Sequence, residues 1–208
     1  MIVLGLTGSI AMGKSTAANA FRRLGVPVHD ADEAVHRLMA KGGDAVAKLA
    51  RIFPDALKDG AIDRAVLRKR VLDDPKALAR LESILHPLVR RSERAFLATA
   101  RQRREALVVL DIPLLYETGG DKRCDVVAVV SAPRSVQLAR LKRRRGFTKE
   151  WLKQIEARQL PDAEKRRRAD FVIPTGLDLR RSLQAIRGIV TMAKDGRIGR
   201  RSRGRPQR

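Results

Sequence analysis

The first thirty residues alternate between apolar runs and a helical pattern. Ile2–Thr7 is rich in Ile, Val and Leu, as expected for a parallel strand that is buried on both faces. A glycine-bearing turn follows, and the apolar positions of Lys14–Leu24 then repeat with the period of a helix. Pro27–His29 can form a second short strand. Strand, turn, helix and strand in this order predict the opening of a doubly wound α/β sheet.

The remaining apolar runs complete the predicted sheet. Three of them have the length and composition of buried strands: Val108–Asp111, Val126–Ser131 and Phe171–Ile173. Between the second and third predicted strands, helical spacing without a convincing strand extends over residues 34–104, which indicates a helical insertion. Together these runs predict five parallel strands flanked by helices.

The last third of the chain contains three further helical patterns. They cover residues 137–145, which become strongly basic, residues 148–159, where Thr148 is a suitable N-cap, and residues 177–192, which are amphipathic.

A glycine-rich segment follows the first predicted strand. Gly8–Ser15 reads Gly-Ser-Ile-Ala-Met-Gly-Lys-Ser, which has the two glycines, the lysine and the hydroxyl of a phosphate-binding loop at the required spacing. Backbone N–H groups of such a loop and the start of the next helix bind phosphates, Lys14 reaches the β- and γ-phosphates of a nucleotide, and Ser15 is a ligand of Mg²⁺. Because the segment lies between a buried strand and a helix, we predict a nucleotide-binding P-loop NTPase fold with three layers.

Two aspartates end the second predicted strand, at the edge where open α/β sheets bind their ligands. A carboxylate here could orient an acceptor hydroxyl and accept its proton. The alternative is that an aspartate caps the following helix, and for Asp30 both interpretations stay open. For Asp32 the catalytic interpretation is favoured by the resemblance described below.

Asp111 and His86 are weaker candidates. Asp111 ends an apolar strand, as an acid that holds Mg²⁺ directly or through water does, but it is equally compatible with the first position of a turn. His86 precedes Pro87 and has no partner at metal-ligand spacing, so it is interpreted as structural or as a substrate contact.

Arginines gather on the basic helical pattern. Arg140 and Arg144 are four residues apart and share one helix face, which could close over phosphates and exclude water. For Arg143 and Arg145 a solvated basic face is the preferred interpretation.

The excess of basic residues is most informative near the C-terminus. The 208 residues contain 45 Lys and Arg against 23 Asp and Glu, a formal net charge of +22. Residues 194–208 are dominated by Gly, Arg and Ser, so we predict a disordered basic tail. Nucleic-acid binding through this tail is possible but secondary, because aromatic residues, at 3%, are too few to provide stacking platforms.

Other features exclude some classes of protein. The single cysteine excludes an internal disulfide framework, and there is neither a signal-peptide pattern nor an apolar segment of about 20 residues that could span a bilayer. A cytoplasmic protein without membrane partners is expected.

Taken together, the motifs resemble those of the dephospho-coenzyme A kinase family, and the match spans most of the chain. The segments that carry the resemblance are Gly5–Gly8, Gly13–Thr16, Asp30–Asp32, Leu81-Glu82, His86-Pro87, Asp111–Glu117, Gln137, Arg140, Arg144, Gln159 and Ala169-Asp170. The loop is common to many nucleotide enzymes, whereas the acidic triplet, the His-Pro pair and the Pro-Leu-Leu-Tyr-Glu run are more specific.

The resemblance implies a three-part kinase with a nucleotide-binding core, a helical acceptor domain and a mobile lid. The corresponding boundaries are 1–33, 105–133 and 169–193 for the core, 34–104 for the acceptor (CoA) domain, 134–168 for the lid and 194–208 for the tail.

The implied reaction transfers a phosphoryl group from ATP to the 3′-hydroxyl of dephospho-CoA, with Mg²⁺. Asp32 would be the general base, Arg140 and Arg144 the lid arginines that contact the phosphates, and His86 a residue of the acceptor side. Lys14 would act on the phosphates, and Ser15 and Asp111 would arrange the metal. Residues 8–16 would bind ATP: Gly8, Ser9, Ile10, Ala11, Met12, Gly13, Lys14, Ser15 and Thr16.

Departures from the family pattern occur in two places. The loop has Ser9, Ala11 and Met12 where Gly, Gly and Ser are usual, and Pro174–Gly176 replaces a turn that contains Asn. A loop that works through its backbone tolerates Ser9 and Ala11 only if both avoid positive φ. The alternative functions are another small-molecule kinase, of the nucleoside monophosphate type, and a nucleic-acid-binding NTPase.

Overall fold

The computed structural model describes residues 1–72, 74–143, 147–176 and 178–199. Its described chain folds as two compact units, Asp30–Thr99 and the remainder of the chain. The first unit to be considered consists of residues 1–29 and 100–199, and it contains the phosphate loop.

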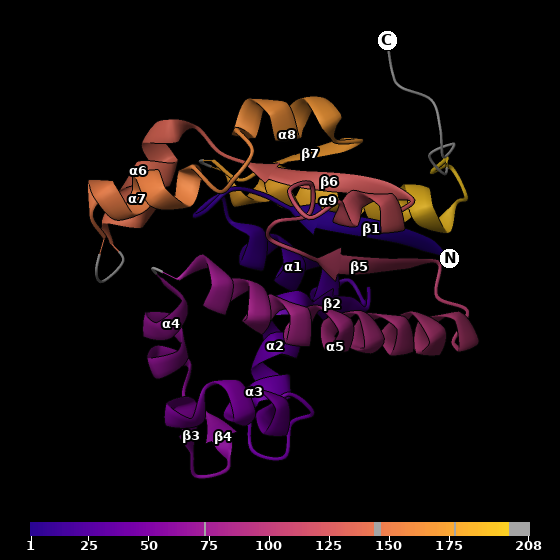
Figure 1. Ribbon diagram of the computed structural model, residues 1–208. Helices are drawn as coiled ribbons and strands as arrows, with labels where there is room; N and C mark the ends of the chain where they lie inside the picture. The colour runs from indigo at the N-terminus through magenta and orange to yellow at the C-terminus, as the bar shows by residue number, and fades with distance from the viewer. Residues whose placement is uncertain (73, 144–146, 177, 200–208) are drawn as a thin grey trace. The chain divides into compact units, whose positions relative to one another are not determined.

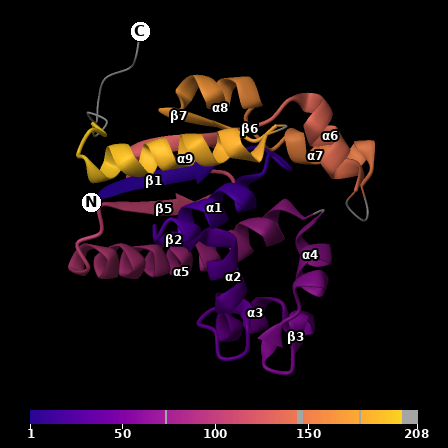
Figure 2. The same cartoon turned by 180° about the vertical axis from the view of Figure 1, so that it is seen from behind.

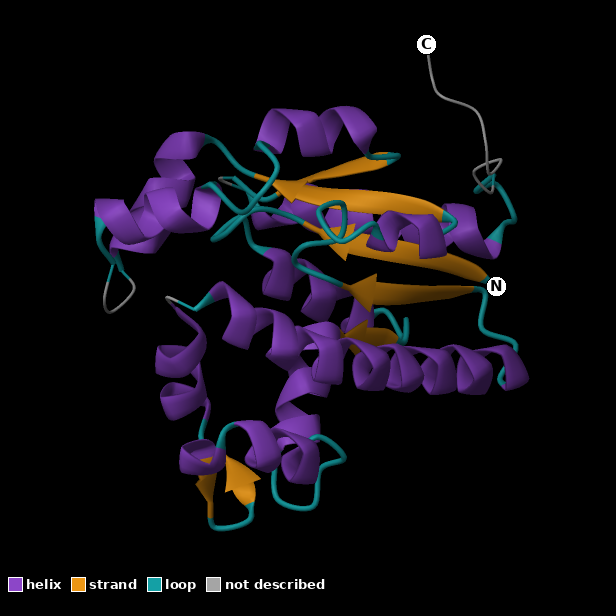
Figure 3. Cartoon of the chain, viewed as in Figure 1, coloured by secondary structure: helices purple, strands orange, loops and turns teal. Residues whose placement is uncertain are grey.

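A five-stranded sheet in the order β2-β5-β1-β6-β7 forms the centre of this unit (Figure 3). The strands are β1 (Ile2–Thr7), β2 (Val28–Asp30), β5 (Leu107–Asp111), β6 (Val126–Ser131) and β7 (Phe171–Pro174). β1 pairs in parallel with both β5 and β6, with Val3 opposite Val108 and Gly5 opposite Val127. The predicted α/β fold with five parallel strands is confirmed.

Helices cover the sheet because its strands are apolar on both faces. α1 (Lys14–Arg23) and α9 (Leu179–Lys194) lie on the same face (Figure 2), where Phe21 and Ile186 are buried against strand residues such as Leu4. Further along the chain lie η2 (Gly120–Arg123), α6 (Arg134–Lys142), α7 (Lys149–Glu156) and α8 (Asp162–Arg168) (Figure 1). The side chain of Thr148 caps α7 by accepting from the N–H of Trp151, as predicted.

The end of the chain differs from the expectation. Lys194 still belongs to α9, and Ile198 is buried against the apolar core. The prediction that disorder begins at Lys194 is therefore wrong for residues 194–199, because Ile198 supplies apolar surface that the overall composition of the tail conceals. Residues 200–208 lie outside the described part of the chain.

The second unit, Asp30–Thr99, is mainly helical and has its own apolar core around Leu49, Leu67 and Leu85. Its elements are α2 (Ala31–Met39), α3 (Val46–Ile52), η1 (Pro54–Ala56), β3 (Leu57–Lys58), β4 (Ala61–Ile62), α4 (Arg64–Leu72) and most of α5 (Pro75–Gln102). The sequence predicted no strand here, so the β3-β4 hairpin is a correction. It turns at Asp59 and Gly60, which both have positive φ, at 51° and 80°.

The predicted boundaries at 34–104 and 134–168 can be compared with this division. The helical unit occupies residues 30–99, and the described residues of the proposed lid fall within the unit of the sheet. The assignment of these segments to an acceptor domain and a lid stays a prediction.

Candidate active site

The loop between β1 and α1 requires glycine at both of its ends. A Cβ atom at Gly8 would lie 2.3 Å from Cγ2 of Val130 and 2.9 Å from its carbonyl oxygen, so no side chain fits there. Gly13 is the N-cap of α1 with φ of 88°, a conformation that favours glycine. The strand, the close packing on β6 and the left-handed cap together bend residues 8–13 around the start of α1, where helix N–H groups bind anions.

Ala11 has a positive φ, the conformation in which the loop was expected not to tolerate a side chain. Its φ is 59°, in the left-handed region, whereas Ser9 keeps an ordinary negative φ. The condition for tolerating both substitutions is therefore met at Ser9 and not at Ala11. A left-handed residue with a Cβ costs about 1–2 kcal/mol, so other contacts must hold the loop in this shape. One is the turn hydrogen bond from the N–H of Met12 to the carbonyl of Ser9, at 3.2 Å.

Lys14 and Asp111 lie together at the carboxyl ends of β1 and β5. Nζ of Lys14 is 2.6 Å from Oδ1 of Asp111, and the Asp111 side chain is only 1% exposed. Ser15, the next residue of α1, is exposed to solvent. A hydroxyl and a carboxylate oxygen are the hard donors that Mg²⁺ accepts, usually together with substrate phosphates, so the donor set of Ser15 and Asp111 fits this ion.

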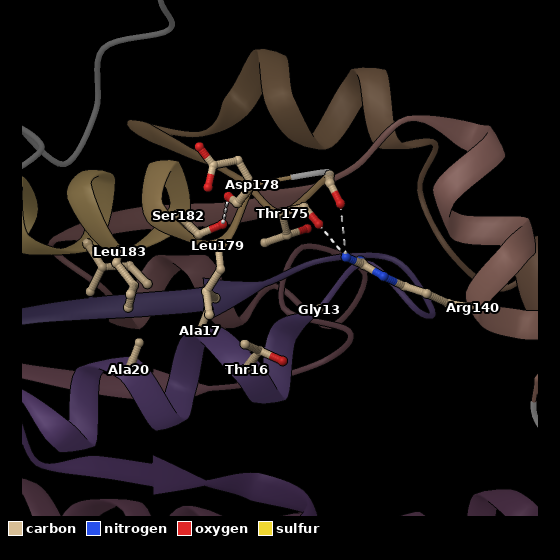
Figure 4. A pocket seen from close by; sticks show the side chains of 12 residues that line it. Gly13, Thr16, Ala17, Ala20, Arg140, Thr175, Asp178, Leu179, Ser182 and Leu183 are labelled. Atoms are coloured by element: carbon tan, nitrogen blue, oxygen red, sulfur yellow. Dashed lines mark hydrogen bonds between the residues drawn. The ribbon is translucent and has the colours of Figure 1, made fainter.

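Arg140 of α6 contacts the loop through its guanidinium group. It donates to the carbonyl of Ala11 at 3.2 Å and to those of Thr175 and Gly176, which follow β7 (Figure 4). The positive charge is thus held beside the phosphate loop by neutral acceptors rather than by an acid. Arg144, the second predicted arginine, lies outside the described residues.

A cavity of about 190 Å³ opens next to the loop (Figure 4). Gly13 and Thr16 line the side towards the loop, and Arg140, Thr175 and Leu179 line other sides. Its walls combine an apolar surface from α1 and α9 with the planar guanidinium of Arg140, a suitable surface for a flat heteroaromatic ring.

Two glutamines hold the peptide groups of Ile10. Nε2 of Gln137 donates to the carbonyl of Ile10 at 2.8 Å, and Oε1 of Gln159 accepts from its N–H at 3.2 Å. Gln137 is 1% exposed, and its own Oε1 accepts from Arg134 at 2.6 Å. Arg134 also binds Glu156, and that hydrogen bond raises the pKa of the Arg134 guanidinium above its already high value.

The predicted acidic residues after β2 and the predicted His86 belong to the helical unit. Oδ1 of Asp30 accepts from the N–H of Glu33 at 3.1 Å, so Asp30 caps α2, which was one of its two interpretations. Asp32 lies in the first turn of α2 and is exposed, and His86 is an exposed residue of α5. Asp32 is thus the aspartate of the pair that does not serve as the N-cap.

Comparison with known proteins identifies the family. A model of the dephospho-CoA kinase family matches residues 2–178, which is most of the chain. The chain belongs to the dephospho-CoA kinase family. It is therefore a kinase, an enzyme that transfers phosphoryl groups.

Dephospho-CoA kinases of several bacteria are close in sequence. The protein of that name from Paramagnetospirillum magneticum is 57% identical over 197 residues, covering 95% of this chain and 93% of the relative. The Rhodospirillum rubrum protein of the same name is 54% identical, with 94% and 93% covered. The recognition of this family from sequence motifs is confirmed.

Solved structures agree with the α/β fold. The protein TT1252 from Thermus thermophilus is 36% identical, with a TM-score of 0.77 and coverage of 91% of this chain and 96% of that chain. A dephospho-CoA kinase from Campylobacter jejuni is 26% identical, with a TM-score of 0.73 and coverage of 94% and 98%. No helix among the described residues is long and apolar enough to cross a membrane.

The structure brings the predicted residues Lys14, Asp111 and Arg140 to the phosphate loop, and it adds supports of the loop that the sequence did not predict. In the sequence, Gln137 and Gln159 were only carriers of the resemblance, and Thr175 was only part of a departure. Thr175 donates its hydroxyl hydrogen bond to the carbonyl of Met12 across 163 positions of sequence, a separation that no local pattern reveals.

Proposed function

We propose that this chain transfers the γ-phosphoryl group of ATP to the 3′-hydroxyl of dephospho-CoA and releases CoA and ADP, the last step of coenzyme A synthesis. The proposal is carried by the phosphate loop at residues 8–15, with Lys14 at its end, in a chain that the dephospho-CoA kinase model matches over residues 2–178. Phosphoryl transfer depends mainly on positioning and on stabilisation of charge, and both are supplied by this loop.

Residues of the sheet unit would bind the nucleotide. Residues 8–16 would receive the phosphates through the ammonium of Lys14 and through N–H groups such as those of Ala11 and Gly13, since the N–H groups of Ile10 and Met12 donate to Gln159 and Ser9. The cavity beside Gly13 would receive the adenine ring. Ser15 and Asp111 would hold Mg²⁺, which neutralises phosphate charge when bound. Arg140 donates to the carbonyl of Ala11 beside the phosphate loop, and Arg140 and Arg144 would contact the phosphates.

Residues of the helical unit would act on the acceptor. Asp32 accepts the proton of the 3′-hydroxyl as oxygen attacks the γ-phosphorus, and the bond from that phosphorus to the bridging oxygen of ADP breaks. Two observations support this role for Asp32. Asp30 caps α2, and Asp32 is exposed and is not the N-cap. His86 is proposed to contact the same substrate.

A panel of acceptors tests this function. The purified protein is given ATP and Mg²⁺ with dephospho-CoA, AMP, CMP or shikimate, and ADP release is followed in a coupled assay. We expect turnover with dephospho-CoA and none with the other three acceptors. Turnover on a nucleoside monophosphate without turnover on dephospho-CoA would replace the proposal with its nearest alternative.

The net charge of +22 favours a second, separate activity, the binding of nucleic acid. Residues 200–208 contain five arginines, and their deletion should reduce the salt dependence of RNA binding while kinase turnover is retained. ATP hydrolysis that is stimulated by nucleic acid would instead support a nucleic-acid-dependent NTPase.

A further inference from the structure

The carbonyl groups at the tip of the phosphate loop all accept hydrogen bonds from side chains outside it. Gln137 donates to Ile10 at 2.8 Å, Arg140 donates to Ala11 at 3.2 Å, and the hydroxyl of Thr175 donates to Met12. These donors come from α6 and from the segment after β7, so two distant parts of the sheet unit converge on three successive residues.

This arrangement determines the direction of the N–H groups. A trans peptide is planar, and its C=O and N–H point in opposite directions. When the carbonyl of Ile10 is held by Gln137, the N–H of Ala11 must point to the other side. The bond from Thr175 to Met12 turns the N–H of Gly13 in the same way.

We propose that Gln137 and Thr175 are positioning residues of the kinase reaction, which turn the N–H groups of Ala11 and Gly13 towards the phosphates before ATP binds. This inference rests on the proposed use of ATP, but it concerns the hydrogen bonds that the two side chains donate to the loop and not a contact with the nucleotide. The strained φ of 59° at Ala11 explains why such supports are needed, because the loop lacks the glycine that would adopt this shape without cost.

The burial of the two side chains agrees with this role. Gln137 is 1% and Thr175 is 8% exposed, and the amide of Gln137 and the hydroxyl of Thr175 both donate to carbonyl groups of the loop. Gln159 complements them by accepting from the N–H of Ile10 at 3.2 Å, which fixes that residue from both sides.

Thr175→Val gives the most selective test, because valine has the shape of threonine without its hydroxyl. The hydroxyl is also 3.1 Å from the carbonyl of Ser131, but this carbonyl keeps its bond of 2.8 Å from the N–H of Thr175 in the variant. The variant therefore loses the hydrogen bond from the Thr175 hydroxyl to the carbonyl of Met12. Thr175→Ser keeps a hydroxyl and serves as the conservative rescue.

The second variant is Gln137→Met, which has a similar length but no amide. Matched controls are Thr191→Val on α9 and Gln154→Met on α7, since both side chains are exposed. ATP affinity is measured by calorimetry without acceptor, and kcat and KM are measured for both substrates.

We expect Thr175→Val and Gln137→Met each to weaken ATP binding and to raise the KM for ATP by about three- to tenfold, because each variant loses one hydrogen bond to the loop. The KM for the acceptor should stay within about twofold, and Thr175→Ser and the controls should behave as the unaltered protein. If both variants bind ATP normally and only their melting temperatures fall, the two residues are structural and the proposal is wrong.

Amide hydrogen exchange, followed by NMR, provides a second test that does not depend on catalysis. In the protein without nucleotide, Thr175→Val should change the exchange rate and chemical shift of the Gly13 amide more than those of residues in β1. An unchanged Gly13 amide would contradict the inference even if Gln137→Met did not fold. Failure of the proposed function is distinguishable, because the unaltered protein would then bind ATP without phosphorylating dephospho-CoA.

Discussion

Nζ of Lys14 lies 2.6 Å from Oδ1 of Asp111, and this carboxylate is almost completely buried. The pair joins the loop after β1 to the end of β5, so the ammonium group is in place beside the loop without a ligand. A buried ion pair contributes little net stability when intact, but the loss of one partner is costly because the other charge stays buried.

Lys14→Met should therefore have two effects. Turnover is expected to fall by at least about a hundredfold, since a preorganised charge at the phosphates is lost. The free energy of unfolding should also fall, by up to about 3 kcal/mol, because Asp111 loses its ammonium partner. Steady-state kinetics and urea denaturation measure these effects, with exposed Lys149→Met as control. A Lys14 variant with ordinary turnover would remove this residue from the mechanism.

Asp32→Asn should reduce kcat by about a hundredfold or more, the lower range for the loss of a general base, and leave ATP affinity nearly unchanged. Asp30→Asn is the matched control, because asparagine caps a helix as well as aspartate does, and α2 should keep its N-cap. Kinetics with saturating ATP and a calorimetric titration of ATP separate the two roles. Near-normal turnover of Asp32→Asn would show that another group accepts the proton.

Ala11→Gly should stabilise the protein. The left-handed φ of 59° is unfavourable for alanine and acceptable for glycine, and this gain exceeds the extra entropy that glycine loses on folding. We expect the free energy of unfolding to rise by about 0.5–1 kcal/mol in urea titrations. Ala139→Gly, at an exposed position inside α6, should have the opposite sign and a similar size. Destabilisation at both positions would contradict the strain assigned to Ala11.

Lys165, which is buried, and Glu117, which is partly buried, form a second ion pair. Nζ of Lys165, whose side chain is 0% exposed, lies 2.9 Å from Oε1 of Glu117, and the same oxygen accepts from the N–H of Leu160 at 2.8 Å. Lys165→Met should cost about 3 kcal/mol because it leaves the carboxylate without its cation.

The double variant Lys165→Met with Glu117→Gln tests the physical reason. It removes both charges and keeps an oxygen for Leu160, so we expect it to be more stable than Lys165→Met alone. The unaltered protein, Lys165→Met, Glu117→Gln and the double variant form a double-mutant cycle. Urea denaturation of these four proteins gives the coupling energy between the two side chains. Simple addition of the two single effects would show that the charges do not interact.

Local patterns were sufficient to predict the loop, the strands beside it and the cap at Thr148. They work because a buried strand, a glycine turn and an N-cap each depend on residues close in sequence. They did not predict the conformation of Ala11, where the carbonyls of three successive loop residues accept from side chains far along the chain. Gln137 is 127 positions from Ile10, so only the folded structure could reveal that the two are bonded.

The β3-β4 hairpin was missed although a signal was present. Asp59-Gly60 is a dipeptide typical of a tight hairpin turn, but the flanking strands are only two residues long and show no alternation of apolar and polar positions. The roles of Asp32 and His86 stay predictions, since they depend on the resemblance to the family and not on a local pattern.

The central position of β1 has a consequence for synthesis of the protein. β1 leaves the ribosome before both of its neighbours, because β5 and β6 end only at Asp111 and Ser131. The backbone N–H and C=O groups of β1 therefore have no strand partner until more than a hundred further residues are made, which at typical elongation rates takes at least about five seconds. Nascent chains of this length should be substrates for the chaperones that shield exposed strands, and they should lose that affinity once residue 131 has emerged.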